Sequence, residues 1–174
     1  MFEEYLEDAH YFAVEAKEKT DEREAKRLYR ACVFYAASAL EAFIGYINNI
    51  VIQVGLQPYE IALLADKKFR LNNGIFEVSD IFELHGIEDK LKFLFYKFNP
   101  SFNLEHYPAW SQYIEFKEFR NMIIHPIHEE DEIDITEYQK KIRRGISAII
   151  EIIDCLCQQI IGKPLRQKIK DLKV

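Results

Sequence analysis

The chain has 174 residues, of which 49% are hydrophobic and 30% charged, with only six Gly and five Pro. This composition is typical of a single globular, helical domain and excludes a disordered chain. The net charge of -6 at pH 7 argues against a protein that coats nucleic acid through bulk charge, but it leaves room for a local basic site.

Neither the N-terminus nor the cysteines indicate export. The first residues, from Met1 to Tyr5, carry no basic or apolar leader pattern, so we expect no secretory signal. The three cysteines are an odd number, and Cys155 and Cys157 are almost adjacent. They do not suggest a disulfide framework, and we expect cysteines of a protein core in the reducing cytoplasm.

Two long helices are predicted at the start of the chain. Apolar residues at helical spacing predict an amphipathic helix from Phe2 to about Lys19. Asp21 with Glu24 three residues later forms a capping box, which predicts a second helix from about residue 22 to residue 53, ended by Gly55.

The second helix is nearly continuous in apolar residues from Ala31 to Val54 and would be long enough to cross a bilayer. It carries Glu41 and is rich in Ala and aromatic residues, and a charge in mid-span is costly. We therefore interpret it as the central, buried helix of a bundle and expect no membrane association.

Residues 56–106 are predicted to form an insertion of short elements. The pattern indicates a helix begun by Pro58, a turn at Asn72-Asn73-Gly74 and a helix over 87–98 that stops at Asn99-Pro100. Between these we expect a short extended piece at 75–78 and a helical turn or two at 79–85. No alternation is sustained enough to predict a sheet.

The rest of the chain predicts two more long helices. One runs from about Pro108 to Ile124, and the other follows an acidic loop at 129–134 and begins at a capping box of Thr136 and Gln139. The second of these helices has a long apolar stripe: Tyr138, Ile142, Ile146, Ile149, Ile153, Leu156 and Ile160. A basic tail over 165–174 follows. We predict an all-α, up-and-down four-helix bundle in a single domain, residues 1–174.

Arg120, Asn121 and His125 lie where the third long helix must end, because Pro126 disfavours the helical conformation of the residue before it. In an ideal helix, positions five apart differ by about 140° around the axis, so Arg120 and His125 would not share a face. Asn121 and His125, four apart, would share one.

The run Arg120-Asn121-Met122-Ile123-Ile124-His125 resembles the Arg-x4-6-His motif of HEPN domains, in which a polar residue, often Asn, commonly follows the Arg. The stretch from Phe34 to Phe43, with Glu41 inside it, resembles the long Ala-rich helix of several such domains, and the order of helices is similar as well. The resemblance covers most of the chain apart from residues 56–106.

The resemblance implies a metal-independent endoribonuclease, of a toxin or defence type, with RNA as its substrate and no cofactor. His125 would act as general base or acid, Arg120 would stabilise charge on the phosphate, and Asn121 would orient His125 or contact a phosphate oxygen. Such domains usually form homodimers in which two motifs face each other, so that Arg and His from two chains share a site. An antitoxin-like protein partner is a further possibility, although Ile127 stands where the Arg-x4-His-x-Tyr variant has its modified Tyr.

Other residues could support this chemistry. We expect Glu41 to be buried and paired with Arg120, either as a structural ion pair or to set the Arg120 rotamer. RNA would be held by Lys140, Lys141, Arg143 and Arg144, for which a solvated helix face is the alternative. His125 and His128 with the acidic residues after them make a poor metal site because Pro126 lies between the histidines, and we expect no metal.

Two other functional classes remain open. The chain could be a catalytically inactive HEPN-like domain that binds nucleic acid, nucleotide or a protein partner, or a helical assembly protein with no nucleic-acid role. In either case Arg120 would pair with a carboxylate, and His125 would stabilise a helix C-terminus.

Overall fold

The computed structural model describes residues 1–124 and 133–173. Over these residues the chain is mostly helical and divides into two compact units. The first unit comprises Met1–Leu40 and Asn103–Val174, and the second comprises Glu41–Phe102. The second unit therefore contains residues 56–102 of the predicted insertion together with the later part of the second helix, and residues 103–106 belong to the first unit.

The two predicted N-terminal helices are confirmed as α1 (Phe2–Lys17) and α2 (Glu22–Val51). The amide of Glu24 donates a 2.8 Å hydrogen bond to Oδ1 of Asp21, so the predicted cap lies at the start of α2. A single 3₁₀ turn (Ile52–Val54) then leads to Gly55, whose φ of 82° ends the helix in the left-handed conformation that glycine adopts without strain.

The stretch Glu22–Val54 is the one part of the described chain that is long and apolar enough to cross a membrane by length and composition. Of its most apolar window, 44% is buried. Core helices of soluble proteins and membrane spans share these properties, so a cytoplasmic location stays a prediction.

The first unit is built around the contact between α5 (Pro108–Ile124) and α6 (Ile135–Leu156). A short 3₁₀ helix (Leu104–His106) precedes α5. Gly145 of α6 faces Phe116 of α5 so closely that an added Cβ would lie 2.0 Å from a ring carbon. The absence of a side chain at this glycine therefore lets the two helices approach.

The apolar stripe predicted for the last long helix is the core of this unit. The residues of α6 that are at most 1% exposed and lie on the stripe are Tyr138, Ile142, Ile146, Ile149, Ile153 and Leu156. A π-helical turn (Cys157–Ile161) follows and ends at Gly162 with a φ of 74°. The predicted Thr136 cap is wrong, because α6 begins at Ile135 and its N-cap is Asp134, two residues before Thr136.

The basic tail folds back onto its own unit through the short helix α7 (Gln167–Lys170). Lys168 pairs with Glu7 of α1 at 2.6 Å, and Lys170 pairs with Asp154 of α6 at 2.8 Å. Ile169 between them is fully buried. The tail is thus anchored by apolar burial, and much of its positive charge is already paired with carboxylates.

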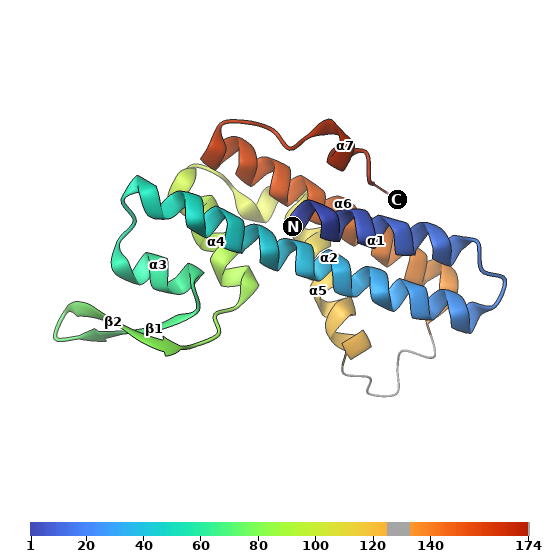
Figure 1. Ribbon diagram of the computed structural model, residues 1–174, viewed down its shortest axis with the longest axis horizontal. Coiled ribbons are helices and arrows are strands. Elements are labelled where there is room, and N and C mark those ends of the chain that lie inside the picture. Colours follow the sequence, from blue (N-terminus) through green and yellow to red (C-terminus); the bar gives the residue numbers. More distant parts are fainter. Residues whose placement is uncertain (125–132, 174) are drawn as a thin grey trace. The chain divides into compact units, whose positions relative to one another are not determined.

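The second unit contains α3 (Pro58–Leu64), β1 (Lys67–Asn72), β2 (Ile75–Phe82) and α4 (Ile87–Phe98). The strands form an antiparallel hairpin whose turn residues Asn73 and Gly74 have φ angles of 49° and 81° (Figure 1). Two predictions are therefore wrong: a sheet is present, and residues 79–82 continue a strand instead of forming a helical turn. The Asn-Gly turn accounts for this, because positive φ at both positions directs the chain back along itself.

Asp66 anchors the base of the hairpin to α4. Its Oδ1 accepts a 2.8 Å hydrogen bond from the amide of His85, and its Oδ2 accepts one of 2.6 Å from Nζ of Lys90, which is buried. Its carbonyl oxygen accepts a hydrogen bond from the amide of Glu83 at 2.9 Å. The φ of 54° at Asp66 is unusual for a residue with a side chain, and these three contacts hold it there.

The hairpin leaves much apolar surface in contact with solvent. Tyr59 of α3 stacks on Phe76 with ring centroids 4.1 Å apart, which covers part of one face. The apolar side chains of the hairpin and its exit that are more than 60% exposed are Leu71, Ile75, Ile81, Phe82 and Leu84. The strands thus owe their position mainly to α3, Asp66 and cross-strand ion pairs such as Arg70–Glu77.

Candidate functional site

Arg120 and Asn121 lie in the last two turns of α5 and contact each other. Nη1 of Arg120 donates a 3.1 Å hydrogen bond to Oδ1 of Asn121 on the exposed side of the helix. Arg120 is half-buried and Asn121 is exposed. The Asn121 side chain therefore restrains the Arg120 guanidinium, whose other N–H groups can still donate to a bound anion.

His125 follows Ile124, the last residue of α5, and lies outside the described residues, as do Pro126, Ile127 and His128. The prediction that His125 meets Arg120 of a second chain is therefore not addressed, and neither is the alternative in which His125 and His128 bind a metal. Within residues 1–124 and 133–173, no group of three or more His, Cys, Asp or Glu side chains could hold a metal ion.

The expectation that Glu41 is buried is wrong. Glu41 is exposed on α2, and the fully buried Phe43, two residues later, lies on the opposite side of the helix. Because water solvates its charge, Glu41 does not need a buried cation as its partner. The physical argument for a pair with Arg120 therefore falls, although a supporting role of Glu41 in function stays a prediction.

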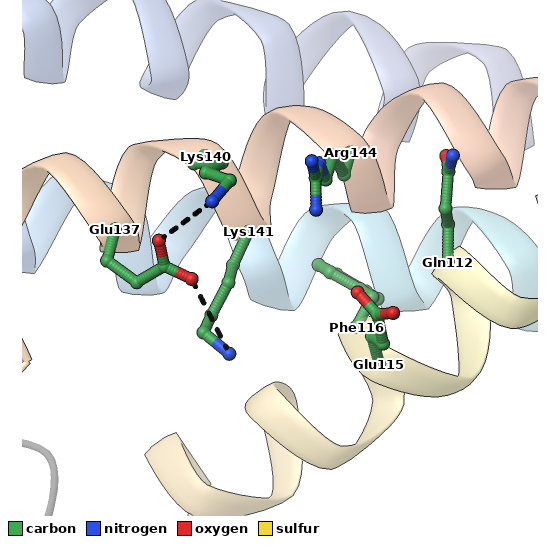
Figure 2. A pocket seen from close by; sticks show the side chains of 7 residues that line it. All are labelled: Gln112, Glu115, Phe116, Glu137, Lys140, Lys141 and Arg144. Atoms are coloured by element: carbon green, nitrogen blue, oxygen red, sulfur yellow. Dashed lines mark hydrogen bonds and ion pairs between the residues drawn. The ribbon is translucent and has the colours of Figure 1, made fainter.

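Three of the four predicted RNA-binding residues come together beside α5. Lys140, Lys141 and Arg144 of α6 line a small pocket with Gln112, Glu115 and Phe116 of α5 and with Glu137 of α6 (Figure 2). Nζ of Lys140 lies 3.3 Å from Oε2 of Glu137, and Nζ of Lys141 lies 4.0 Å from Oε1 of the same residue (Figure 2). Three cations and two carboxylates therefore share the pocket, so its positive charge is only partly available to a phosphate. Arg143 is exposed and does not line it.

A larger, open groove of about 230 Å³ adjoins this pocket and shares Glu115 and Lys141 with it. Its other lining residues are Glu118, Phe119, Met122 and Ile133. Nζ of Lys141 lies 5.7 Å from the centre of the Phe119 ring, within the range of a cation–π contact. The groove thus combines an apolar floor with two carboxylates and one ammonium group.

Arg120 projects from a different side of α5 than the groove. The lining residues Glu115, Phe119 and Met122 are spaced by four and three positions and share one face of the helix. Arg120 is five residues beyond Glu115, which is about 140° around the axis. Neither Arg120 nor Asn121 lines the pocket or the groove. The structure thus gathers the basic residues of α6 together but does not join them to Arg120 in one cleft.

Sequence reasoning missed the two groove carboxylates, Glu115 and Glu118. Their spacing relative to Phe119 and Met122 was a usable signal, because positions 115, 118, 119 and 122 repeat at helical intervals on one face. That spacing alone does not distinguish them from ordinary surface residues, because a Glu on an amphipathic helix is normally solvated.

The cysteines carry no reactive thiol of the kind that catalysis uses. Burial raises the pKa of Cys157 to about 11, and burial also raises the pKa of the half-buried Cys155. In α2, burial raises the pKa of Cys32 to about 12. These thiols therefore stay protonated at neutral pH and are poor nucleophiles, as expected for cysteines of a protein core.

Comparison with known protein families, with curated proteins and with solved structures finds no match to this chain. The resemblance to HEPN domains therefore rests on the Arg120-to-His125 run, the helix around Glu41 and the order of the helices.

Proposed function

We propose that the chain is a metal-independent endoribonuclease of HEPN type, with a four-helix bundle formed by α1, α2, α5 and α6, and that it acts as a toxin or defence component. The observation that carries the proposal is the hydrogen bond between Arg120 and Asn121 at the exposed end of α5. It presents a restrained guanidinium five residues before His125 in the sequence.

The chemistry follows from these residue types. An imidazole can take the proton from the ribose 2′-hydroxyl or give one to the leaving 5′-oxygen, which needs no metal. A guanidinium stabilises the negative charge that develops on the phosphate oxygens, and its planar set of donors suits two oxygens at once. Asn121 then acts first on Arg120, by fixing the direction in which the guanidinium points.

We also propose that the site is shared between the chains of a homodimer. The angular separation of Arg120 and His125 on an ideal helix favours this arrangement, since each Arg could then work beside the His of the other chain. Lys140, Lys141, Arg143 and Arg144 would contribute sequence-independent phosphate contacts away from the reacting group.

The test incubates the purified full chain with mixed RNA in the presence of EDTA, next to His125→Ala and Arg120→Ala. We expect cleavage by the unchanged chain and a loss of at least about 100-fold in each variant, which is the usual contribution of a general acid or base or of one charge-stabilising donor. His106→Ala and Arg70→Ala, which change exposed residues far from the motif in sequence, are the matched controls and should cleave normally. Absence of cleavage, or equal cleavage by His125→Ala, would refute the nuclease proposal.

Mixing the Arg120→Ala and His125→Ala chains tests the shared site. If each site takes Arg120 from one chain and His125 from the other, mixed dimers contain one intact site and part of the activity returns. If both residues act within one chain, no mixed dimer has an intact site and the mixture stays inactive.

The alternative is a catalytically inactive HEPN-like domain that binds nucleic acid, nucleotide or a protein partner such as an antitoxin-like protein. One observation favours it: the groove between α5 and α6 carries mixed charge and excludes Arg120 from its lining. RNA binding without cleavage, weakened by Lys140→Ala but unaffected by His125→Ala, would support this alternative.

A further inference from the structure

The charged residues of α5 lie on two different sides of the helix. The helix carries four of them: Glu115, Lys117, Glu118 and Arg120. In an ideal helix Glu115 and Glu118 lie about 60° apart around the axis, and Lys117 and Arg120 are separated by the same angle. Each carboxylate is about 100–160° away from each cation. α5 therefore has an acidic side and a basic side.

The acidic side of α5 is the one that borders the groove. Glu115 and Glu118 line the groove, whereas Arg120 and Lys117 line neither the groove nor the adjoining pocket. The basic residues that do line the pocket or the groove belong to α6 and lie on this acidic side of α5. They therefore supply no positive charge on the side where Arg120 projects.

On the basic side, Lys117 lies one turn before Arg120 and Asn121. It precedes them by three and four residues, the two spacings at which side chains of a helix are neighbours, with Cβ atoms about 5–6 Å apart. Lys117 and Arg120 are half-buried, and Asn121 is exposed. This exposure fits long side chains whose apolar stems lie along the protein surface while their charged ends reach water. One surface of α5 thus combines an ammonium group, a guanidinium group and an amide.

A phosphate bound at Arg120 experiences repulsion from two sources. Arg120 lies four residues before Ile124, the last residue of α5, and the C-terminal end of a helix carries partial negative charge. The whole chain has a net charge of -6, which also disfavours a polyanion. Asn121 accepts a hydrogen bond from Arg120 but brings no charge of its own. A second positive group beside Arg120 offsets both effects.

We propose that Lys117 binds the RNA phosphate next to the one that reacts at Arg120. This inference rests on the proposed function, because it takes RNA as the substrate and Arg120 as the residue at the reacting phosphate. The separation of about 5–6 Å between the two Cβ atoms lets each cation meet a phosphate of its own along one strand. An ammonium group binds a phosphate as a point charge, whereas the planar guanidinium holds two oxygens at once. Lys117 therefore adds affinity and fixes the position of the strand without taking part in the chemical step.

The other role open to Lys117 is structural, with its apolar stem covering part of the helix surface. Three variants separate the two roles. Lys117→Met keeps an apolar stem of similar length and removes the charge, Lys117→Gln removes the charge but stays polar, and Lys117→Arg keeps the charge. Lys26→Met is the matched control, because Lys26 is also a half-buried lysine in a helix of the first unit and pairs with Glu22 at 3.0 Å. Far-UV circular dichroism checks that each variant is folded.

The first measurement is the affinity of the full chain for a labelled, single-stranded RNA pool of random sequence in which every 2′-hydroxyl is methylated. Attack by the 2′-oxygen cannot cleave this probe, so it reports binding alone. We expect Lys117→Met and Lys117→Gln to weaken binding about tenfold, the contribution of one charge-assisted hydrogen bond. The slope of log affinity against log salt concentration should become shallower by about 0.7, the share of one phosphate contact in a single strand. Lys117→Arg should keep the affinity and the slope, and Lys26→Met should change neither.

The second measurement is the rate of cleavage of unmodified RNA by the same variants. We expect Lys117→Met to raise KM about tenfold and to leave kcat nearly unchanged, whereas Arg120→Ala lowers kcat. A lower kcat with an unchanged KM in Lys117→Met would place Lys117 at the reacting phosphate and overturn the proposal. So would an unchanged affinity and salt slope in Lys117→Met, equal losses in Lys117→Met and Lys117→Arg, or a parent chain that does not bind the probe.

The two measurements also separate this inference from the nuclease proposal. A chain that binds the probe through Lys117 but cleaves no RNA refutes the nuclease and leaves Lys117 as an RNA contact. Cleavage of RNA that proceeds with the same KM in Lys117→Met refutes the contact and leaves the nuclease.

Discussion

Among single residues, Asp66 combines several structural roles in the second unit. Its carboxylate pairs with the ammonium group of Lys90, whose side chain is 4% exposed. It also accepts hydrogen bonds from the backbone amides of Glu83 and His85, which follow β2, and its own backbone is in the left-handed conformation. A carboxylate that pairs a buried ammonium group cannot be removed without leaving that charge uncompensated.

We therefore expect Asp66→Asn to destabilise the second unit by about 3 kcal/mol, the usual cost of breaking a buried pair. Asn tolerates positive φ, so this change removes the charge without adding backbone strain. Urea unfolding followed by circular dichroism, together with hydrogen exchange of the β1 and β2 amides, measures the effect.

Asp80→Asn is the matched control for Asp66, because Asp80 pairs with Lys67 while 95% exposed and should matter little. The double variant Asp66→Asn, Lys90→Met removes both charges and should regain much of the lost stability. If the two single variants unfold alike, the Lys90 pair does not anchor the hairpin.

The side-chain contacts of single residues were hard to predict from the sequence. Asn121 was expected to orient His125 or to contact a phosphate oxygen, which stays a prediction, whereas the contact that the structure describes is the hydrogen bond from the adjacent Arg120. Glu41 was misjudged because hydropathy describes the average of a helix, whereas exposure depends on which side of that helix the residue lies. The contacts of Asp66 with His85 and Lys90 join positions that no local pattern relates.

At the scale of elements, the crossing of α5 and α6 depends on one glycine. Gly145 is buried in the middle of α6, where an alanine Cβ would meet the Phe116 ring at 2.0 Å. Phe116 is itself 3% exposed and has little space into which to move. Intrinsic helix propensity favours Ala over Gly by about 1 kcal/mol, so packing and propensity act in opposite directions here.

We expect packing to prevail, so that Gly145→Ala lowers the free energy of unfolding by about 1–3 kcal/mol. Fluorescence of Trp110, the single tryptophan of the chain and part of α5, reports unfolding of this unit. Gly45→Ala is the control, since Gly45 also lies inside a helix, is exposed and has no atom within 4 Å of an added Cβ. Because Gly45 belongs to the second unit, its unfolding is followed by far-UV circular dichroism. That variant should be neutral or stabilised by up to about 1 kcal/mol. A Gly145→Ala chain as stable as the parent would show that the helices can separate at no cost.

Three boundaries of the long helices were predictable because a cap or a helix-breaking residue marks them: Asp21, Gly55 and Pro108. The cap of the last long helix was misplaced at Thr136. The hairpin was not predicted, although its Asn-Gly turn was recognised. Its strands bury little apolar surface, so they lack the strict alternation that marks a strand with one buried face. The pairing of the two strands depends on the turn, on cross-strand ion pairs and on Asp66. A hydropathy pattern shows none of these features.

At the scale of the whole molecule, the buried ionisable groups make the fold sensitive to alkali. Burial raises the pKa of Cys32 to about 12 and that of Cys157 to about 11, and it also raises the pKa of Tyr29 and of Tyr107. The exposed Glu77 and Asp80 have lowered pKa values, mainly through hydrogen bonds from Asn72 and Lys67 respectively, and titrate in acid. The groups that respond above pH 8 are therefore largely those of the first unit.

The direction of the effect follows from proton counts. In the unfolded chain the thiol of Cys32 ionises near its ordinary pKa of about 8.5, whereas in the folded chain it keeps its proton up to a pKa of about 12. Between these values the unfolded state binds fewer protons, so the free energy of unfolding falls as the pH rises, by at most about 1.4 kcal/mol per pH unit for each such thiol.

We expect the free energy of unfolding, measured by Trp110 fluorescence in urea, to be constant up to about pH 8 and to decline steadily from pH 9 to pH 11. Cys32→Ala removes this titration, so its decline should be shallower even though the smaller side chain lowers stability at every pH. Equal slopes for the two chains would mean that Cys32 ionises as readily in the folded protein as in the unfolded one.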